Sequence, residues 1–209
     1  MSLAAFIVRG KNLLSVAGIA IAGGVLAYFA IGQGQESIYL ENGLMENSQI
    51  GLLFLAFFGF FYAIFRLAGR HRILVMFLAL LCFLFAAREF QENFNVPKII
   101  LYLVSREGRT VPLIVLLVLF GRIIKDSKHY LQHFSRYLQS YAGLYIFVSA
   151  LLLLVFAQSF DRKWIVLPYL SFWEEYAELA AYYYLMLASF VAAPSFAAID
   201  AELAAAANG

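Results

Sequence analysis

The stretch RILVMFLALLCFLFAARE, residues 72–89, decides the fold class, because its apolar residues run without a break from Ile73 to Ala87. An α-helix rises about 1.5 Å per residue, so roughly 17–25 residues of this kind cross a bilayer. Lipid offers no hydrogen-bond partners, so a crossing segment must satisfy its own backbone N–H and C=O groups, as a helix does. The stretch therefore predicts a transmembrane helix over 72–88.

The composition extends this prediction to the whole chain. Of its 209 residues, 64% are hydrophobic and 13% are charged, whereas soluble domains have about 45–50% apolar and about 25% charged residues. The apolar runs are too continuous for the alternating strands of a β-barrel. We predict an all-α polytopic membrane helix bundle, with a single integral membrane domain over 1–209. Its expected transmembrane helices, about six in number, cover 12–32, 48–67, 72–88, 110–124, 139–159 and 175–198.

The remaining segments are shorter or less regular. The segment 110–124 contains Arg122 and fits either a short, tilted span, which we favour, or a re-entrant segment. Interfacial segments are expected near 96–108, 125–138 and 163–173, the last of which holds both tryptophans. The Ala-rich tail AAIDAELAAAANG, residues 197–209, is expected to fray.

The distribution of Lys and Arg predicts the orientation in the membrane. Nine of the fifteen basic residues are expected on the side of both termini, which makes that side cytoplasmic. Ten of the thirteen acidic residues are expected on the other, outer side, although acidic residues hardly influence topology. The nine basic residues are Arg9, Lys11, Arg66, Arg70, Arg72, Arg122, Lys125, Lys128 and Arg136.

Carboxylates at the outer side are the main functional signal. Ionisable residues near lipid usually face the bundle interior, and Glu175 and Glu178 share one helix face because they are three residues apart. Arg88 is expected to pair with Glu178 or Glu175, whereas Glu89 points about 100° away around the helix. The candidate polar cluster is Glu46, Arg88, Glu89, Glu175 and Glu178, with Glu41, Lys98, Asp161 and Arg162 as secondary candidates.

Two interpretations of this cluster remain open at the sequence level. Arg binds carboxylates bidentately, so the cluster could be a structural Arg–Glu network that locks the helices together. Carboxylates that converge at one depth could equally line a functional polar cavity.

The three histidines are expected in short polar connections. His129 and His133 have the i, i+4 spacing of a metal pair, but Tyr130 stands where a HExxH motif has Glu, so the metal signal is weak. The same region is basic and amphipathic, which favours contact of Lys125, Lys128 and Arg136 with anionic lipid.

Other motifs give no further direction. The sequence has no P-loop, no GxSxG and no zinc signature, and no motif indicates a cofactor. Nothing in it predicts nucleic-acid binding. Gly18 and Ala22 have a small-xxx-small spacing, which suits close helix packing within the chain, self-association or contact with other membrane subunits.

Several short motifs together resemble an uncharacterised family of small polytopic bacterial inner-membrane proteins. The motifs are AREF (87–90), PKIILYLVS (97–105), VP (111–112), SFDR (159–162) and EEYAEL (174–179). The resemblance covers roughly residues 40–190 and departs from the family pattern at Gln91, Tyr176 and Ala177. It implies an inner-membrane location and no particular activity.

Three functions fit these observations. A non-catalytic subunit or scaffold of a membrane complex demands least of the sequence. A transporter, or a protein that binds an ion or a proton at the carboxylates, is the alternative. A lipid-modifying enzyme with a Glu base and Arg88 on a phosphate is the second alternative, and it lacks an evident nucleophile.

Overall fold

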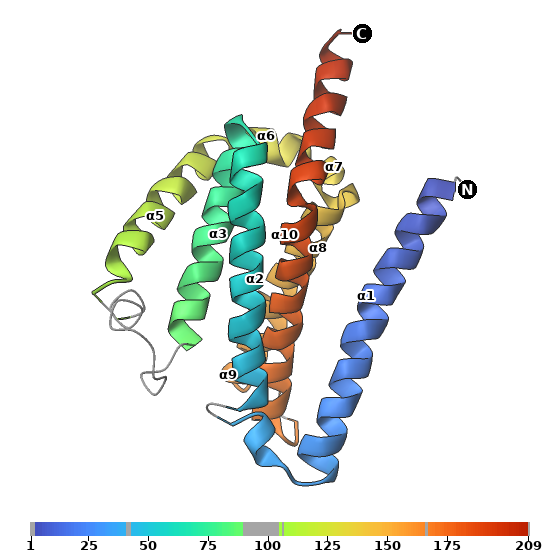
Figure 1. Ribbon diagram of the computed structural model, residues 1–209, viewed down its shortest axis with the longest axis vertical. Coiled ribbons are helices and arrows are strands. Elements are labelled where there is room, and N and C mark those ends of the chain that lie inside the picture. The colour runs from blue at the N-terminus through green and yellow to red at the C-terminus, as the bar shows by residue number, and fades with distance from the viewer. Residues whose placement is uncertain (1–2, 41–42, 90–104, 106, 166, 209) are drawn as a thin grey trace.

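The computed structural model describes residues 3–40, 43–89, 105, 107–165 and 167–208, with side chains from Ser15 to Ala206 within those ranges. Every regular element in these ranges is helical, which confirms the all-α prediction. Long helices run along one axis of the molecule, and two short helices lie across one end of it (Figure 1).

The elements follow the predicted order. Helix α1 continues into a π-helical turn, η1, and a π-helical stretch, η3, joins α8 to α9. The bounds are α1 Leu3–Ala27, η1 Tyr28–Gly32, the 3-10 turn η2 Glu36–Ile38, α2 Leu44–Arg66, α3 Gly69–Glu89, α5 Thr110–Lys125, α6 Ser127–Gln132, α7 Phe134–Gln139, α8 Tyr141–Leu151, η3 Leu152–Ala157, α9 Gln158–Asp161 and α10 Leu170–Asn208.

Among the described residues, five helical segments are long and apolar enough to cross a membrane. Large apolar side chains such as Phe58, Phe65 and Leu154 are exposed on the outside of the bundle. Exposed apolar area on this scale marks contact with lipid, so the chain is an integral membrane protein. The five segments are Ser15–Gly32, Leu44–Arg66, Gly69–Glu89, Tyr141–Asp161 and Leu170–Ala206.

Helix α5 is not one of these five, because its 16 residues rise only about 24 Å. It nevertheless carries the chain from the end where α3 finishes to the end where α6 begins (Figure 1). Its Phe120 stacks on Phe77 of α3, with ring centroids 6.0 Å apart. Both ends of the chain consequently lie at the same end of the bundle (Figure 1).

Three predicted segments differ from the structure. Residues 170–173 of the expected interfacial segment form the first turn of α10, which begins at Leu170. The tail expected to fray is also helical, and α10 continues through Pro194 to Asn208. Region 125–138 forms two short helices, α6 and α7, instead of one, and most of 96–108 lies outside the described residues.

Helices α2, α3, α8 and α10 form the core. Small residues on α10, including Ala181, Ala188 and Ala192, are fully buried there and let neighbouring backbones approach closely. One close approach is between Gly59 of α2 and Ser189 of α10, where a Cβ on Gly59 would collide with the Ser189 side chain. Glycine is therefore the residue that permits α2 and α10 to pack at this distance.

Helix α1 stands away from this core (Figure 1). Only 17% of its apolar window is buried. One of its contacts with α10 is made by Tyr176, whose hydroxyl donates to the backbone carbonyl of Ile19 at 2.7 Å and whose ring occupies the space beside Gly23. The small residues of α1 thus serve contact within the chain at this point.

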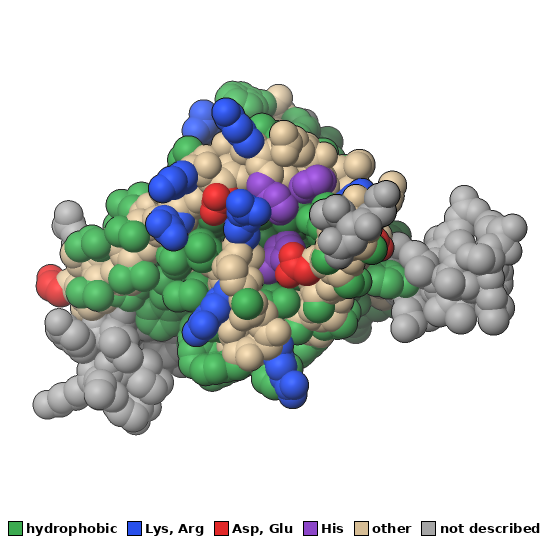
Figure 2. Space-filling model, turned by 90° about the horizontal axis from the view of Figure 1, so that it is seen from above, with side chains coloured by type: hydrophobic (Ala, Val, Ile, Leu, Met, Phe, Trp, Pro, Cys, Tyr) green, Lys and Arg blue, Asp and Glu red, His purple; other side chains and the backbone are tan. Residues whose placement is uncertain are grey.

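The bundle has two chemically different ends. We call the end where α3 finishes and α10 begins the carboxylate end, and the end that holds both chain termini the terminal end. Figure 2 shows the terminal end, where Lys and Arg side chains surround histidines and a few carboxylates.

We expect Gly59→Ala to destabilise the protein by roughly 1–3 kcal/mol, because the new methyl group overpacks the crossing of α2 and α10. Gly51 lies on the same helix with no atom within 4 Å of a Cβ, so Gly51→Ala should be neutral or slightly stabilising. Unfolding in detergent, followed by circular dichroism, measures both variants. Equal midpoints for the two would contradict the close approach.

Candidate functional site

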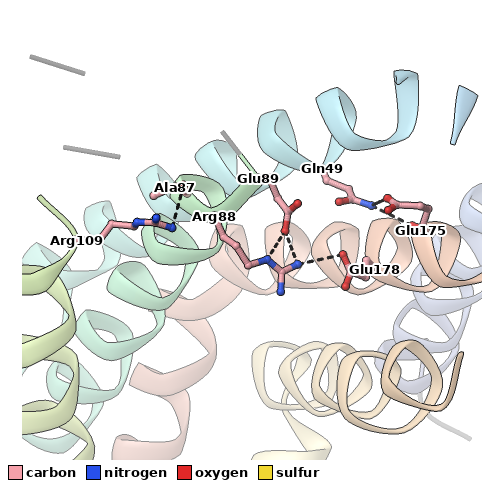
Figure 3. A network of polar contacts seen from close by, with 7 residues as sticks. All are labelled: Gln49, Ala87, Arg88, Glu89, Arg109, Glu175 and Glu178. Atoms are coloured by element: carbon pink, nitrogen blue, oxygen red, sulfur yellow. Dashed lines mark hydrogen bonds and ion pairs between the residues drawn. The ribbon is translucent and has the colours of Figure 1, made fainter. Parts of the chain in front are cut away.

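The candidate site lies at the carboxylate end, where three helices bring polar side chains together (Figure 3). Helix α2 supplies Gln49 from its second turn, and α3 supplies Arg88 and Glu89 from its last turn. Helix α10 supplies Glu175 and Glu178, which the helical repeat places on one face. Residues far apart in sequence thus meet at one depth of the bundle.

Arg88 contacts two carboxylates. Its Nη2 lies 3.3 Å from Glu178 Oε2, which confirms one of the two expected pairings. Its Nε donates to Glu89 Oε1 at 2.6 Å, and its Nη2 also contacts that oxygen, so Glu89 belongs to the cluster although it neighbours Arg88 in sequence. The Arg88 side chain is 55% exposed, whereas Glu89 and Glu178 are only 14% and 16% exposed.

Glu175 has a different partner. Gln49 Nε2 donates to Glu175 Oε2 at 2.8 Å and to the Glu175 backbone carbonyl at 3.1 Å. These two bonds fix the orientation of the amide, because only its nitrogen can donate. Gln49 is 0% exposed, and its Oε1 is buried without a hydrogen-bond partner among the described residues. In Figure 3 this oxygen points away from Glu175, toward the side of Glu89 and Glu178.

The charges of the cluster do not balance. Glu89, Glu175 and Glu178 face one guanidinium, that of Arg88, so these four side chains together carry a formal charge of −2. The positive charge is bound to Glu89 and Glu178, and Glu175 receives only a neutral amide. The arrangement therefore has acceptor oxygens in excess at Gln49 and Glu175, which is complementary to a cation or a proton donor.

The other predicted residues lie near the cluster or outside the described ranges. Glu46 is in the first turn of α2, three residues before Gln49, and it is Gln49 that meets the α10 carboxylates. Asp161 and Arg162 are exposed at the end of α9, and Arg162 lies over the Trp164 ring at 5.4 Å. Glu41 and Lys98 lie outside the described residues.

Sequence reasoning missed Gln49, which makes the closest contact between α2 and the acidic face of α10. The available signal was a neutral amide within the apolar segment 48–67, where an uncharged polar side chain needs a partner from a neighbouring helix.

A second polar group at the terminal end was also missed. His71 is in the first turn of α3 and 2% exposed, so it does not lie in a polar connection as expected. Its Nδ1 is 3.0 Å from Asp200 Oδ2, and its Nε2 is 2.7 Å from the Tyr137 hydroxyl. Its ring stacks on Phe196 at 5.1 Å. The supposedly frayed tail thus supplies the carboxylate that orients a buried imidazole.

The hydrogen bonds of His71 assign roles to its two nitrogens. A carboxylate can only accept, so Nδ1 carries the proton that goes to Asp200. In the neutral form of the ring, Nε2 accepts from the Tyr137 hydroxyl, and burial raises the pKa of Tyr137, which keeps that hydroxyl protonated. The contact ties α3, α7 and α10 together.

The predicted histidine pair lies beside this group. The His129 and His133 rings are 4.9 Å apart, edge to face, and His129 Nδ1 is 3.3 Å from Arg70 Nη1. Arg70 also pairs with Asp126 at 3.5 Å. The described residues contain no group of three or more His, Cys, Asp or Glu side chains able to hold a metal ion.

Comparisons with protein families, with curated proteins and with solved structures give no match for this chain.

The environment of His129 predicts a pH dependence of stability. Desolvation by burial, and then the charges of Arg70, His133 and His71, lower the pKa of His129, against a smaller opposite effect of Asp126. Below the ordinary pKa of a histidine, about 6.5, the unfolded chain therefore binds a proton that the folded protein does not. The stability contributed at higher pH is lost as the pH falls through that range.

We expect His129→Gln to reduce this loss of stability between pH 7 and pH 5. Thermal unfolding in detergent at a series of pH values gives the slope for each protein. Gln132→Ala, an exposed change in the same short helix, is the control and should keep the wild-type slope. A His129→Gln slope as steep as that of the wild type would contradict the prediction.

Proposed function

We propose that this integral membrane protein binds a proton or a small cation beside Gln49 and Glu175 and uses it in transport. The observation that supports this proposal is the buried Gln49 Oε1, for which the described residues supply no donor; the nitrogen of the same amide donates to Glu175. A buried acceptor without a donor costs about 1–3 kcal/mol. A ligand with a positive charge or an N–H or O–H donor would remove this cost.

An Arg–Glu network whose only role is to hold the helices together would have a different geometry. In such a network, each carboxylate forms an ion pair with the guanidinium that holds the helices together. Arg88 forms ion pairs with Glu178 and Glu89, but Glu175 lies on the far side of Gln49 and forms no ion pair with another described residue. This difference favours a binding role for Gln49 and Glu175. The ion pairs of Arg88 would then hold the neighbouring helices in position around them.

We also propose an orientation of the protein in the membrane. The carboxylate end faces outward, and the terminal end faces the cytoplasm of a bacterial cell, with the protein in the inner membrane. Support comes from the basic side chains around α6 and α7 (Figure 2) and from the position of both termini at one end (Figure 1).

A role as a subunit of a larger membrane complex is the second candidate. Its support is the position of α1, which is apolar and yet mostly outside the core. Ile21, which lies between the two residues of α1 that meet Tyr176, is nevertheless 68% exposed. A neighbouring membrane protein could pack into this position, although lipid can also cover it.

For the transport proposal, we expect reconstituted protein to couple a gradient of Na⁺, K⁺ or methylammonium to a pH change inside liposomes that contain a pH-sensitive dye. Glu175→Gln and Gln49→Leu should each lower the rate roughly tenfold or more, because each removes an oxygen that contacts the bound ion.

Glu36→Gln is the matched control, because Glu36 is an exposed carboxylate at the same end of the bundle. Its rate should equal that of the wild type. Elution volume and unfolding midpoint show whether Glu175→Gln is still folded. Wild-type rates equal to those of empty liposomes, or an unchanged rate in folded Glu175→Gln, would refute the proposal.

For the subunit role, we expect Ile21→Cys to cross-link to a second protein in native membranes treated with a thiol-to-thiol or thiol-to-amine reagent. Phe65→Cys, equally exposed at 70% but on α2, should give no such product. The native Cys82 is buried and should not react. Absence of any product from Ile21→Cys would count against a partner on α1.

A further inference from the structure

A hollow of about 470 Å³ lies at the terminal end, between α7, the start of α8 and the last third of α10. Val191, Pro194 and Ile199 make its wall mostly apolar, and Arg136 and Glu202 add opposite charges. Neither the carboxylate cluster nor His71 contributes to it.

Arg136 brings an unused donor to the hollow. Its Nη1 is buried and has no hydrogen-bond partner in the part of the chain that the structure describes. A buried donor of a charged group is costly to leave unpaired, and a guanidinium matches the oxygens of a phosphate group especially well. The donor therefore indicates that an anionic oxygen belongs beside Arg136.

The start of α8 adds positive potential at the same place. Ser140 caps this helix by accepting from the Gly143 N–H at 3.1 Å, and the Ala142 N–H donates to Ser195 Oγ at 3.4 Å. Ser140 and Ser195 both line the hollow. The positive end of the α8 dipole is thus directed at it, which favours a phosphate near Arg136.

Glu202 supplies the opposite charge. Ser195, Ile199 and Glu202 are spaced four and three residues apart, so they share one face of α10. Arg136 and Glu202 both border the hollow, but they do not form one of the ion pairs found among the described residues. A ligand with a negative and a positive group could pair with both.

The depth of the hollow matches that of lipid headgroups. Arg136 lies in α7, just before the membrane segment that begins at Tyr141, and Glu202 lies near the end of the segment Leu170–Ala206. The apolar wall formed by Val191 and Ile199 lies further inside the segment of α10. Charges at the boundary above an apolar wall are the pattern of a phospholipid, with its headgroup at the interface and its chains below.

We propose that this hollow binds a zwitterionic phospholipid with a primary amine, of the phosphatidylethanolamine type. Its phosphate accepts hydrogen bonds from Arg136, and its ammonium donates to Glu202, while an acyl chain lies along Val191 and Ile199. A quaternary ammonium headgroup has no N–H to donate to Glu202, and a glycerol headgroup has no positive charge, so both bind less tightly.

The test is native mass spectrometry of the full-length protein with an equimolar mixture of phosphatidylethanolamine, phosphatidylcholine and phosphatidylglycerol that share the same acyl chains. We expect the ethanolamine lipid to be retained roughly tenfold more than either other lipid. Free phosphoethanolamine, added in excess, should not displace it, because the free headgroup lacks the chain that contacts the apolar wall.

Two variants test the contributions of Arg136 and Glu202 separately. Arg136→Gln should weaken the binding of all three lipids, and Glu202→Gln, an exposed and structurally mild change, should abolish only the preference for ethanolamine over choline. Lys128→Gln, an exposed basic change at the same end, should alter neither result. Equal retention of the three lipids by the wild type, a preference for phosphatidylglycerol, or an unchanged preference in Glu202→Gln would overturn the proposal.

Discussion

The close approach of α2 and α10 at Gly59 and Ser189 is the constraint on which the rest of the structure depends. The two helices run in the same direction, so their polar first turns lie at the same end of the bundle (Figure 1). Within lipid there is no hydrophobic force between helices, and tight packing of small residues has to hold them together. This packing brings Gln49 within hydrogen-bond distance of Glu175.

Helix α10 then fixes the depth of both polar groups. Glu178 and Asp200 are separated by about 33 Å along an α-helix, which is close to the roughly 30 Å thickness of the hydrocarbon core. Polar side chains are costly between these levels, and the intervening part of α10 is occupied by residues such as Ala181, Ala188 and Ala192. The carboxylate cluster and the His71 group therefore lie at opposite boundaries of the same membrane segment.

The sequence predicts those parts of the structure that depend on amino-acid composition and on the spacing of apolar residues along the chain. Continuous apolar runs predict the helices of the bundle, and a single Arg at the depth of several carboxylates predicts the contact of Arg88 with Glu178. The contacts of Gln49 and His71 were not predictable in this way. Gln49 meets Glu175 across 126 positions and His71 meets Asp200 across 129, so both depend on how α2, α3 and α10 pack. Asp200 was hidden further, because an Ala-rich tail shows no apolar period that reveals its buried face.

The two buried polar atoms without a partner show that the ends of the bundle have opposite chemistry. Among the described side chains these atoms are Gln49 Oε1, an acceptor at the carboxylate end, and Arg136 Nη1, a donor at the terminal end. An acceptor beside a carboxylate is complementary to a cation or a proton donor, whereas a guanidinium donor at the start of a helix is complementary to an anion. No simple ion satisfies both atoms. The proposed ion binding at one boundary and the proposed lipid binding at the other are therefore independent of each other.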